Sequence, residues 1–178
     1  MMTFLRAGLK NIGQTGSIVE SSSYLSDKMI RTVDFNKKLQ IVELGAGTGS
    51  ITKRLLKKMN NQSVLTAFEI DRYLFNKLQQ NSDNRLKEIN ADVCDIGQYC
   101  ASQSVDYIIS GLPLANIPAT KKLSILESCF RVLKPGGWYI QFQYSLNDFR
   151  LLKQIFSKVD SCFTLYNLPP AFIYYAKK

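Results

Sequence analysis

The 178-residue chain contains no histidine. This absence excludes Ser-His-Asp and Cys-His nucleophile pairs, zinc sites with histidine ligands and imidazole general bases. Cysteine is sparse, and the spacing of the four that are present matches no Cys-x-x-Cys pair: Cys94, Cys100, Cys129 and Cys162. We therefore expect free thiols rather than disulfides, and no bound metal.

Long apolar stretches are missing as well. No uncharged apolar run approaches the roughly 18 residues that a spanning helix needs. The longest candidate, residues 107–120, is interrupted by a glycine and two prolines. The N-terminus also lacks the apolar segment and cleavage site of a signal peptide. We therefore expect one domain, either soluble or attached to a membrane surface.

Charge is unevenly distributed along the chain. The formal net charge is +9, but residues 61–120 hold seven acidic and only four basic residues. The segments on either side, 1–60 and 121–178, carry ten and nine basic residues against four and three acidic ones. The acidic middle segment suits binding of a cationic ligand, and the basic end segments suit contact with an anionic surface. A solvated surface with unevenly distributed charge would give the same pattern.

Hydrophobic periodicity predicts strands that alternate with helices. Short apolar runs ending at turn residues indicate buried strands, and apolar residues recurring every three or four positions indicate helices. The expected strands are 39–44, 63–69, 86–91, 105–110, 138–144, 161–167 and 171–176, and the expected helices are 48–59, 71–80, 120–133 and 146–156. This alternation predicts a parallel sheet with helices on both faces.

The turn after the first strand is rich in glycine. It reads Glu-Leu-Gly-Ala-Gly-Thr-Gly over residues 43–49. Glycines at such a turn let a ligand approach the backbone, and the following helix presents free N–H groups. The dinucleotide pattern G-x-G-x-x-G/A would require its third small residue at the position of Ser50. The E-x-G-x-G-x-G form instead resembles motif I of class I S-adenosylmethionine (SAM)-dependent methyltransferases, while a purely structural turn or a nucleotide site is the alternative.

Three further landmarks follow in the same order as in that family. Glu69 ends the second strand, where a carboxylate can accept both ribose hydroxyls. Asp71 is expected to cap the next helix. Asp92 ends the third strand, where the family places an acceptor for the adenine amine, and its alternative role is to cap the segment 93–99. The run Lys-Pro-Gly-Gly at 134–137 resembles the turn before the family's fifth strand.

This resemblance implies a Rossmann-like α/β fold with a mostly parallel seven-stranded sheet, helices on both faces, and SAM as the cofactor. The residues that it assigns to the cofactor are Glu43, Gly45, Ala46, Gly47, Gly49, Glu69, Ile70, Asp92, Val93, Ser110 and Gly111.

Two groups within the family resemble different parts of the chain. Residues 39–113 are similar to the ribosomal RNA adenine dimethylases, whose fourth strand is followed by Asn-[LIV]-Pro-aromatic. Here the segment 111–114 reads Gly-Leu-Pro-Leu, without the asparagine or the aromatic ring that stacks on a flipped base. The chain also ends before the small C-terminal helical domain of those enzymes. Methyl transfer to RNA adenine is therefore the alternative function.

The second resemblance extends from Phe4 to about Tyr175. The segments Ser-Gly-Leu-Pro-Leu (110–114), Gly-Gly-Trp-Tyr-Ile-Gln-Phe-Gln-Tyr (136–144) and Asn-Leu-Pro-Pro-Ala-Phe (167–172) are similar to the small bacterial phospholipid N-methyltransferases. The N-terminal segment 4–29 also resembles that family's leader, with Glu20 in place of the usual proline and Ser23 in place of the usual arginine. This resemblance implies methyl transfer to the ethanolamine head group of a phospholipid.

The leader offers a physical check on a membrane partner. On a helical wheel Phe4, Leu5, Leu9 and Ile12 share one face, with Arg6 and Lys10 beside it. A short basic amphipathic helix can lie in an anionic interface, whereas the alternative is an ordinary first helix packed on the domain. We expect a leader over 1–36, a SAM-binding domain over 37–178, and peripheral attachment to the cytoplasmic face of the membrane.

Methyl transfer to an amine requires that a proton leave the ammonium before attack. Without histidine, the proton acceptor must be water, a carboxylate or a tyrosine. Tyr144, Tyr24 and Asn167 are expected at the carboxyl edge of the sheet, where open α/β folds bind ligands, and are the candidate catalytic residues. Leu112, Pro113 and Tyr144 are the candidate substrate-binding residues, although Tyr144 is equally suited to the core.

Overall fold

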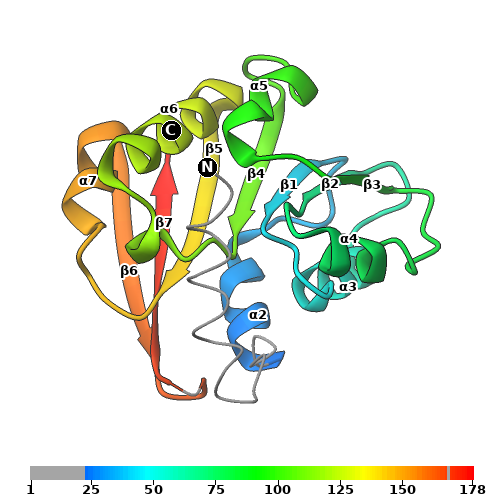
Figure 1. Cartoon of the computed structure of the whole chain (residues 1–178), viewed down its shortest axis with the longest axis horizontal. Coiled ribbons are helices and arrows are strands. Elements are labelled where there is room, and N and C mark those ends of the chain that lie inside the picture. The colour runs from blue at the N-terminus through cyan, green and yellow to red at the C-terminus, as the bar shows by residue number, and fades with distance from the viewer. Residues whose placement is uncertain (1–22, 168) are drawn as a thin grey trace.

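A computed structural model describes residues 23–167 and 169–178. They form one sheet with helices on both of its faces (Figure 1). The expected amphipathic face at positions 4–12 lies outside the described residues. Glu20, which stands in place of the usual proline of the leader, also lies outside them. Within the described part, no helix is both long enough and apolar enough to cross a membrane.

The sheet contains seven strands in the order β3-β2-β1-β4-β5-β7-β6. The strands are β1 (Gln40–Leu44), β2 (Val64–Phe68), β3 (Leu86–Ile89), β4 (Val105–Ser110), β5 (Leu133–Gln143), β6 (Lys158–Thr164) and β7 (Ala171–Lys177). The first five are parallel, and β7 runs antiparallel to both β5 and β6. The expected mostly parallel, seven-stranded fold is therefore confirmed.

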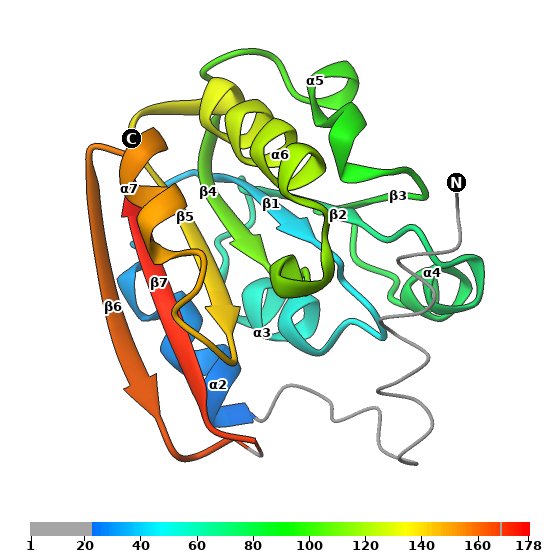
Figure 2. The same cartoon turned by 60° about the vertical axis from the view of Figure 1, so that its left-hand side comes forward.

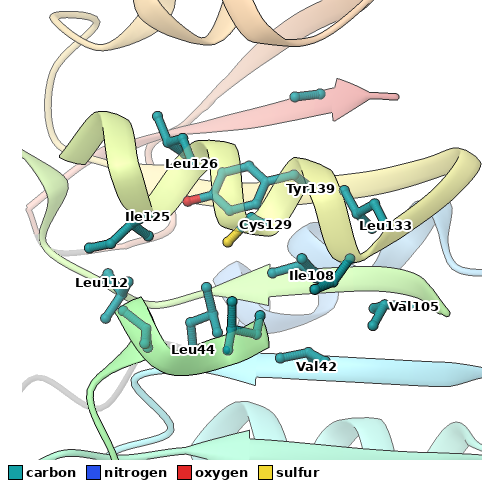
Figure 3. Close-up of a cluster of buried hydrophobic side chains, with 14 of the residues drawn as sticks. Val42, Leu44, Val105, Ile108, Leu112, Ile125, Leu126, Cys129, Leu133 and Tyr139 are labelled. Carbon is teal, nitrogen blue, oxygen red and sulfur yellow. The ribbon is translucent and has the colours of Figure 1, made fainter. Parts of the chain in front are cut away.

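Helices cover the sheet in two groups. The helices are α2 (Ser23–Met29), α3 (Ser50–Lys58), α4 (Arg72–Leu78), α5 (Ile96–Tyr99), α6 (Ala119–Val132) and α7 (Phe149–Ile155), with short 3-10 turns η1 (Ile30–Thr32), η2 (Val93–Asp95) and η3 (Leu114–Asn116). The face of α2 and α3 and the face of α6 and α7 each bury a separate apolar cluster (Figure 2). Figure 3 shows the second cluster, where Ile125, Cys129 and Tyr139 pack between α6 and the strands.

The C-terminal part of the expected leader packs into the apolar cluster on the α3 side of the sheet. Leu25, Met29, Ile30 and Val33 are buried in the cluster shared with α3 and the sheet. The Tyr175 hydroxyl donates to the Lys28 carbonyl oxygen at 2.5 Å, which ties α2 to β7. Residues 23–36 therefore pack as an integral layer of the domain.

Several expected boundaries differ from the structure, among them those of β5 and β6. The Lys-Pro-Gly-Gly turn lies inside β5, as an irregularity between the pairs Val105–Leu133 and Tyr107–Trp138. Gly136 adopts a positive φ of 78° and donates its N–H to the Lys178 carbonyl oxygen at 3.0 Å, so the turn is held against the chain end. Strand β6 runs over 158–164 rather than 161–167, because its pairing with β7 begins at Lys158 and Lys177.

Candidate functional site

The glycine-rich turn joins the end of β1 to the start of α3. Gly45, Gly47 and Gly49 all have positive φ, at 71°, 58° and 87°, which residues with a β-carbon rarely adopt. The N–H groups of Gly45 and Ala46 both donate to the Phe68 carbonyl oxygen, at 2.9 and 3.0 Å. The three glycines are therefore required by the backbone path, which brings the turn against the end of β2.

Glu69 lies directly beyond that strand end and is 5% exposed. One carboxylate oxygen accepts the Gly47 N–H at 2.8 Å, and the other accepts the Asp71 N–H at 2.8 Å. Burial raises the pKa of this carboxyl group, and the two N–H donors oppose that shift. Each oxygen has a further lone pair, so Glu69 can accept hydroxyl groups of a ligand while holding the turn. As expected, Asp71 caps α4, accepting from the Tyr73 and Leu74 N–H groups at 2.9 and 3.1 Å.

Glu43 lies beneath the same turn and is 1% exposed. The Thr52 hydroxyl donates to Oε2 at 2.6 Å, while Oε1 is buried and has no hydrogen-bond partner among the described residues. Burial raises the pKa of this group to about 8. This side chain therefore supports the turn from behind as a mostly neutral group at pH 7.

Asp92 and Lys121 form an ion pair beyond the end of β3. Asp92 Oδ1 accepts the Cys94 N–H at 3.0 Å, so its role as the cap of η2 is confirmed. Lys121 Nζ, from α6, donates to Oδ2 at 2.6 Å. Burial acts to raise the pKa of Asp92, but these hydrogen bonds outweigh it and the pKa is lowered. Asp92 is thus held ionised, with a fixed orientation.

A cavity at the carboxyl ends of β1, β2, β3 and β4 brings these groups together. Nine of the residues selected from the sequence line it: Gly45, Gly47, Glu69, Ile70, Asp92, Val93, Gly111, Leu112 and Pro113. The Gln141 side chain donates from Nε2 to the Leu112 carbonyl oxygen at 2.8 Å, and this hydrogen bond fixes the loop that carries Gly111, Leu112 and Pro113. A β-carbon at Gly111 would lie 3.1 Å from the Gly45 carbonyl oxygen, so the two loops are in close approach.

Four predicted cofactor residues do not line this cavity. Glu43 lies behind the turn, and Ala46 is buried in the core beside α3. Gly49 caps α3, and Ser110 is fully buried, its hydroxyl accepting the Leu112 N–H at 3.3 Å. Their contribution is to shape the loops, and a direct contact with the cofactor stays a prediction.

Sequence reasoning missed six lining residues, most of them apolar: Phe68, Leu74, Ala91, Ile117, Lys121 and Ile125. Lys121 and Ile125 are spaced four residues apart on α6, so they face the cavity together, and Ile117 lines it from just before the helix. That spacing was the available signal, but nothing local shows which face of α6 crosses the strand ends.

The three candidate catalytic residues lie at the expected edge but outside the cavity. Tyr144 follows β5 and is 48% exposed, with its ring centre 5.9 Å from that of Phe142. Tyr24 lies in the first turn of α2, with its ring centre 4.5 Å from that of Tyr166. Asn167 lies in the β6–β7 connection, where its side chain donates to the Pro169 carbonyl oxygen at 2.8 Å. Their catalytic roles stay predictions.

The described residues fit SAM. The apolar lining suits an adenine ring, and Glu69 suits the ribose hydroxyls. All four cysteines are free, as expected. Among the described residues, no three His, Cys, Asp or Glu side chains gather at a metal site.

Known proteins are similar to this chain in fold and in sequence. A structure of a SAM-dependent methyltransferase from Aquifex aeolicus aligns with 94% of this chain and 97% of its own, at a TM-score of 0.73 and 15% identity. An ornithine lipid N-methyltransferase from Singulisphaera acidiphila is 28% identical over 98% of this chain and 94% of its own length. O-methyltransferase 3 from Dictyostelium discoideum is 30% identical over 76% of this chain, which spans 32% of that protein.

The family model described as a methyltransferase domain matches residues 41–137, from β1 into β5. That segment carries the glycine-rich turn, Glu69, Asp92 and the cavity-lining start of α6. The match covers more than half of the chain, and the chain therefore belongs to the methyltransferase domain family, as a class I SAM-dependent methyltransferase.

Proposed function

We propose that this methyltransferase transfers methyl groups to the amine nitrogen of a membrane lipid, with the ethanolamine head group of a phospholipid as the acceptor. The observation that carries the proposal is the 28% identity to an ornithine lipid N-methyltransferase over nearly the full length of both chains. An ornithine head group and an ethanolamine head group share a free amine. The segments at 110–114, 136–144 and 167–172 resemble those of phospholipid N-methyltransferases. This resemblance favours the ethanolamine lipid over the ornithine lipid as the acceptor.

SAM, when bound, supplies an electrophilic methyl group on its sulfonium sulfur. The chain's own part is then to orient the cofactor and admit the acceptor in line with the methyl group. Glu69, held by two backbone N–H groups, and the glycine turn fix the nucleoside end. Pro113 and Leu112 form the wall of the cavity next to β5, and Phe142 connects that wall to Tyr144.

We assign recognition of the acceptor amine to the carboxyl edge next to β5 and β7. Tyr144 and Tyr24 present half-exposed aromatic rings there, and such rings attract a methylated ammonium. Asn167 is buried in the β6–β7 connection at the same edge. In this assignment the ammonium loses its proton to water, because the chain has no imidazole. The site of action is then the cytoplasmic face of the membrane.

Labelled SAM tests the acceptor directly. The purified chain is offered anionic liposomes containing phosphatidylethanolamine, liposomes containing ornithine lipid, and undermethylated ribosomal subunits in parallel. We expect label in phosphatidylethanolamine. Label confined to ornithine lipid would move the acceptor to another lipid amine, and label confined to ribosomal adenine would replace the proposal with the RNA alternative.

A further inference from the structure

Exposed apolar side chains gather at one end of the molecule. The described residues hold nine large apolar side chains that are exposed, and six of these lie where β5 and β6 end or α2 begins. We call these six the aromatic rim: Tyr24, Tyr144, Leu146, Phe163, Leu165 and Tyr166. The other three, Tyr73, Tyr99 and Leu123, lie singly on α4, α5 and α6.

Contacts between α2 and the β6–β7 connection hold the rim together. The rings of Tyr24 and Tyr166 are 4.5 Å apart, and Lys28 Nζ lies 5.8 Å from the centre of the Tyr24 ring. The same Lys28 Nζ donates to the Phe163 carbonyl oxygen at 2.8 Å. Figures 1 and 2 both show the start of α2 beside the turn between β6 and β7. Leu165 and Tyr166 project at this turn and are each 71% exposed.

The rim is uncharged and is flanked by positive charge. Residues 161–176, which include the whole β6–β7 connection, contain no ionisable acid or base other than tyrosine and cysteine. Asp27, the acid nearest Lys28 in sequence, is neutralised by Arg54 at 2.6 Å and Lys58 at 3.8 Å. Those two residues belong to α3, where Lys53 and Lys57 add further positive charge beside α2.

This combination matches a bilayer interface better than a second copy of the chain. Tyrosine and leucine on a projecting turn, with lysine and arginine beside them, suit the boundary between acyl chains and anionic head groups. Pairing of two chains along the open edge of β6 is opposed by the exposed charges of Lys158 and Asp160 at its start.

We propose that the aromatic rim inserts into the interfacial layer of an anionic membrane and directs the cofactor cavity toward the lipid head groups. The proposal rests on the proposed lipid acceptor, because it places the docking surface on the edge of the sheet where that acceptor would enter. It assigns membrane contact to residues of the folded domain, independently of the N-terminal segment.

The test compares single variants of the full chain for co-sedimentation with vesicles of phosphatidylglycerol and phosphatidylethanolamine. Leu165→Asp and Tyr166→Asp place a charge on the rim, and each should lower partitioning at least tenfold. Tyr73→Asp is the matched control, because Tyr73 is 64% exposed but lies on α4, and it should stay within twofold of the unmodified chain. The melting temperature and SAM affinity of all three should be unchanged.

A fluorescence measurement keeps the proposal falsifiable if an aspartate variant folds poorly. In a Trp138→Phe background the chain has no other tryptophan, so Tyr166→Trp and Tyr73→Trp each report one position. Anionic vesicles should shift the emission of the first to shorter wavelength and leave the second unchanged. Rim variants that sediment like the unmodified chain would overturn the proposal. So would a change of oligomeric state in the aspartate variants, since it would assign the rim to a second copy.

Methylation of phosphatidylethanolamine dispersed in detergent separates this proposal from the proposed acceptor. The Leu165→Asp and Tyr166→Asp variants should retain that activity, because the cavity is intact. Sedimentation that depends on the rim, with no methylation in either format, would support the docking surface while overturning the acceptor.

Discussion

At the scale of single residues, two buried carboxylates serve opposite sides of the glycine turn. Glu69 already accepts one N–H on each oxygen, so it is fixed before any ligand arrives. Glu43 has one oxygen without a partner among the described residues and is held largely neutral by burial. The first is preorganised for hydroxyl groups of a ligand, and the second supports the turn from behind through its bond with Thr52.

Glu69→Ala should weaken SAM binding, because the ribose loses a charged acceptor and the turn loses the bond to Gly47. A hydrogen bond to a charged group contributes about 1.5–3 kcal/mol, which corresponds to roughly ten- to 150-fold in the dissociation constant. Calorimetric titration measures this change. Glu127→Ala, at an exposed position of α6 away from the cavity, serves as the control. Equal affinity in the two variants would remove Glu69 from the site.

The raised pKa of Glu43 predicts how stability depends on pH. The folded state holds the proton up to about pH 8, whereas the unfolded chain releases it near pH 4.5. The unfolding free energy should therefore fall as pH rises from about 5 to 8, by an amount of the order of a few kcal/mol. Urea unfolding at several pH values measures the slope. Glu43→Gln should flatten it, and a slope that persists in this variant would assign the effect to other groups.

At the scale of elements, a buried ion pair helps to hold the connection from β5 to α7. Lys122 Nζ of α6 lies 2.5 Å from Asp148 Oδ1, and the two side chains are 12% and 6% exposed. This pair anchors the loop that carries Tyr144 and Leu146, and it connects α6 to the edge where the aromatic rim lies.

Lys122→Met should lower the unfolding free energy by about 3–5 kcal/mol, because it leaves Asp148 charged and buried without a partner. Lys37→Met is the matched control, since Lys37 and Asp34 are paired at 3.1 Å but are 73% and 40% exposed. That control should change stability by less than about 1 kcal/mol. Chemical denaturation compares the two. Adding Asp148→Leu to Lys122→Met should restore most of the loss, and no restoration would show that the pair itself is not the cause.

Sequence patterns predicted most elements, because apolar periodicity reports which face of an element is buried. The strand before the glycine turn was placed to within one residue, and the acid after β2, which was predicted to bind the cofactor, lines the cavity. Local sequence patterns failed where contacts between residues far apart in the sequence determine where an element begins or turns. The start of β6 depends on Lys177, and the turn at 134–137 depends on contact with Lys178. Lys121 was missed because its role requires that α6 cross beyond β3, which no local pattern contains.

At the scale of the whole molecule, the cofactor cavity lies across the two apolar clusters. Phe68, Leu112 and Ile125 line it from the cluster beneath α6 and α7. The glycine turn leads into α3, whose Ile51 and Leu55 belong to the opposite cluster. A ligand bound there contacts segments anchored on both sides of the sheet, so it should stabilise the domain as one unit.

SAM should therefore raise the stability of a single cooperative unfolding transition. At a ligand concentration 100 times the dissociation constant, the gain is about 2.7 kcal/mol, or roughly 5–11 °C in melting temperature for a chain of this length. Fluorescence of Trp138, the single tryptophan, reports β5, and far-UV circular dichroism reports the helices. The two curves should coincide with and without SAM, because α2 and its buried residues belong to the same core as α3. Glu69→Ala should lose about half of the gain or more at the same SAM concentration. Two separate transitions, with α2 melting away from a stable remainder, would mean that residues 23–36 unfold independently of the domain that binds the cofactor.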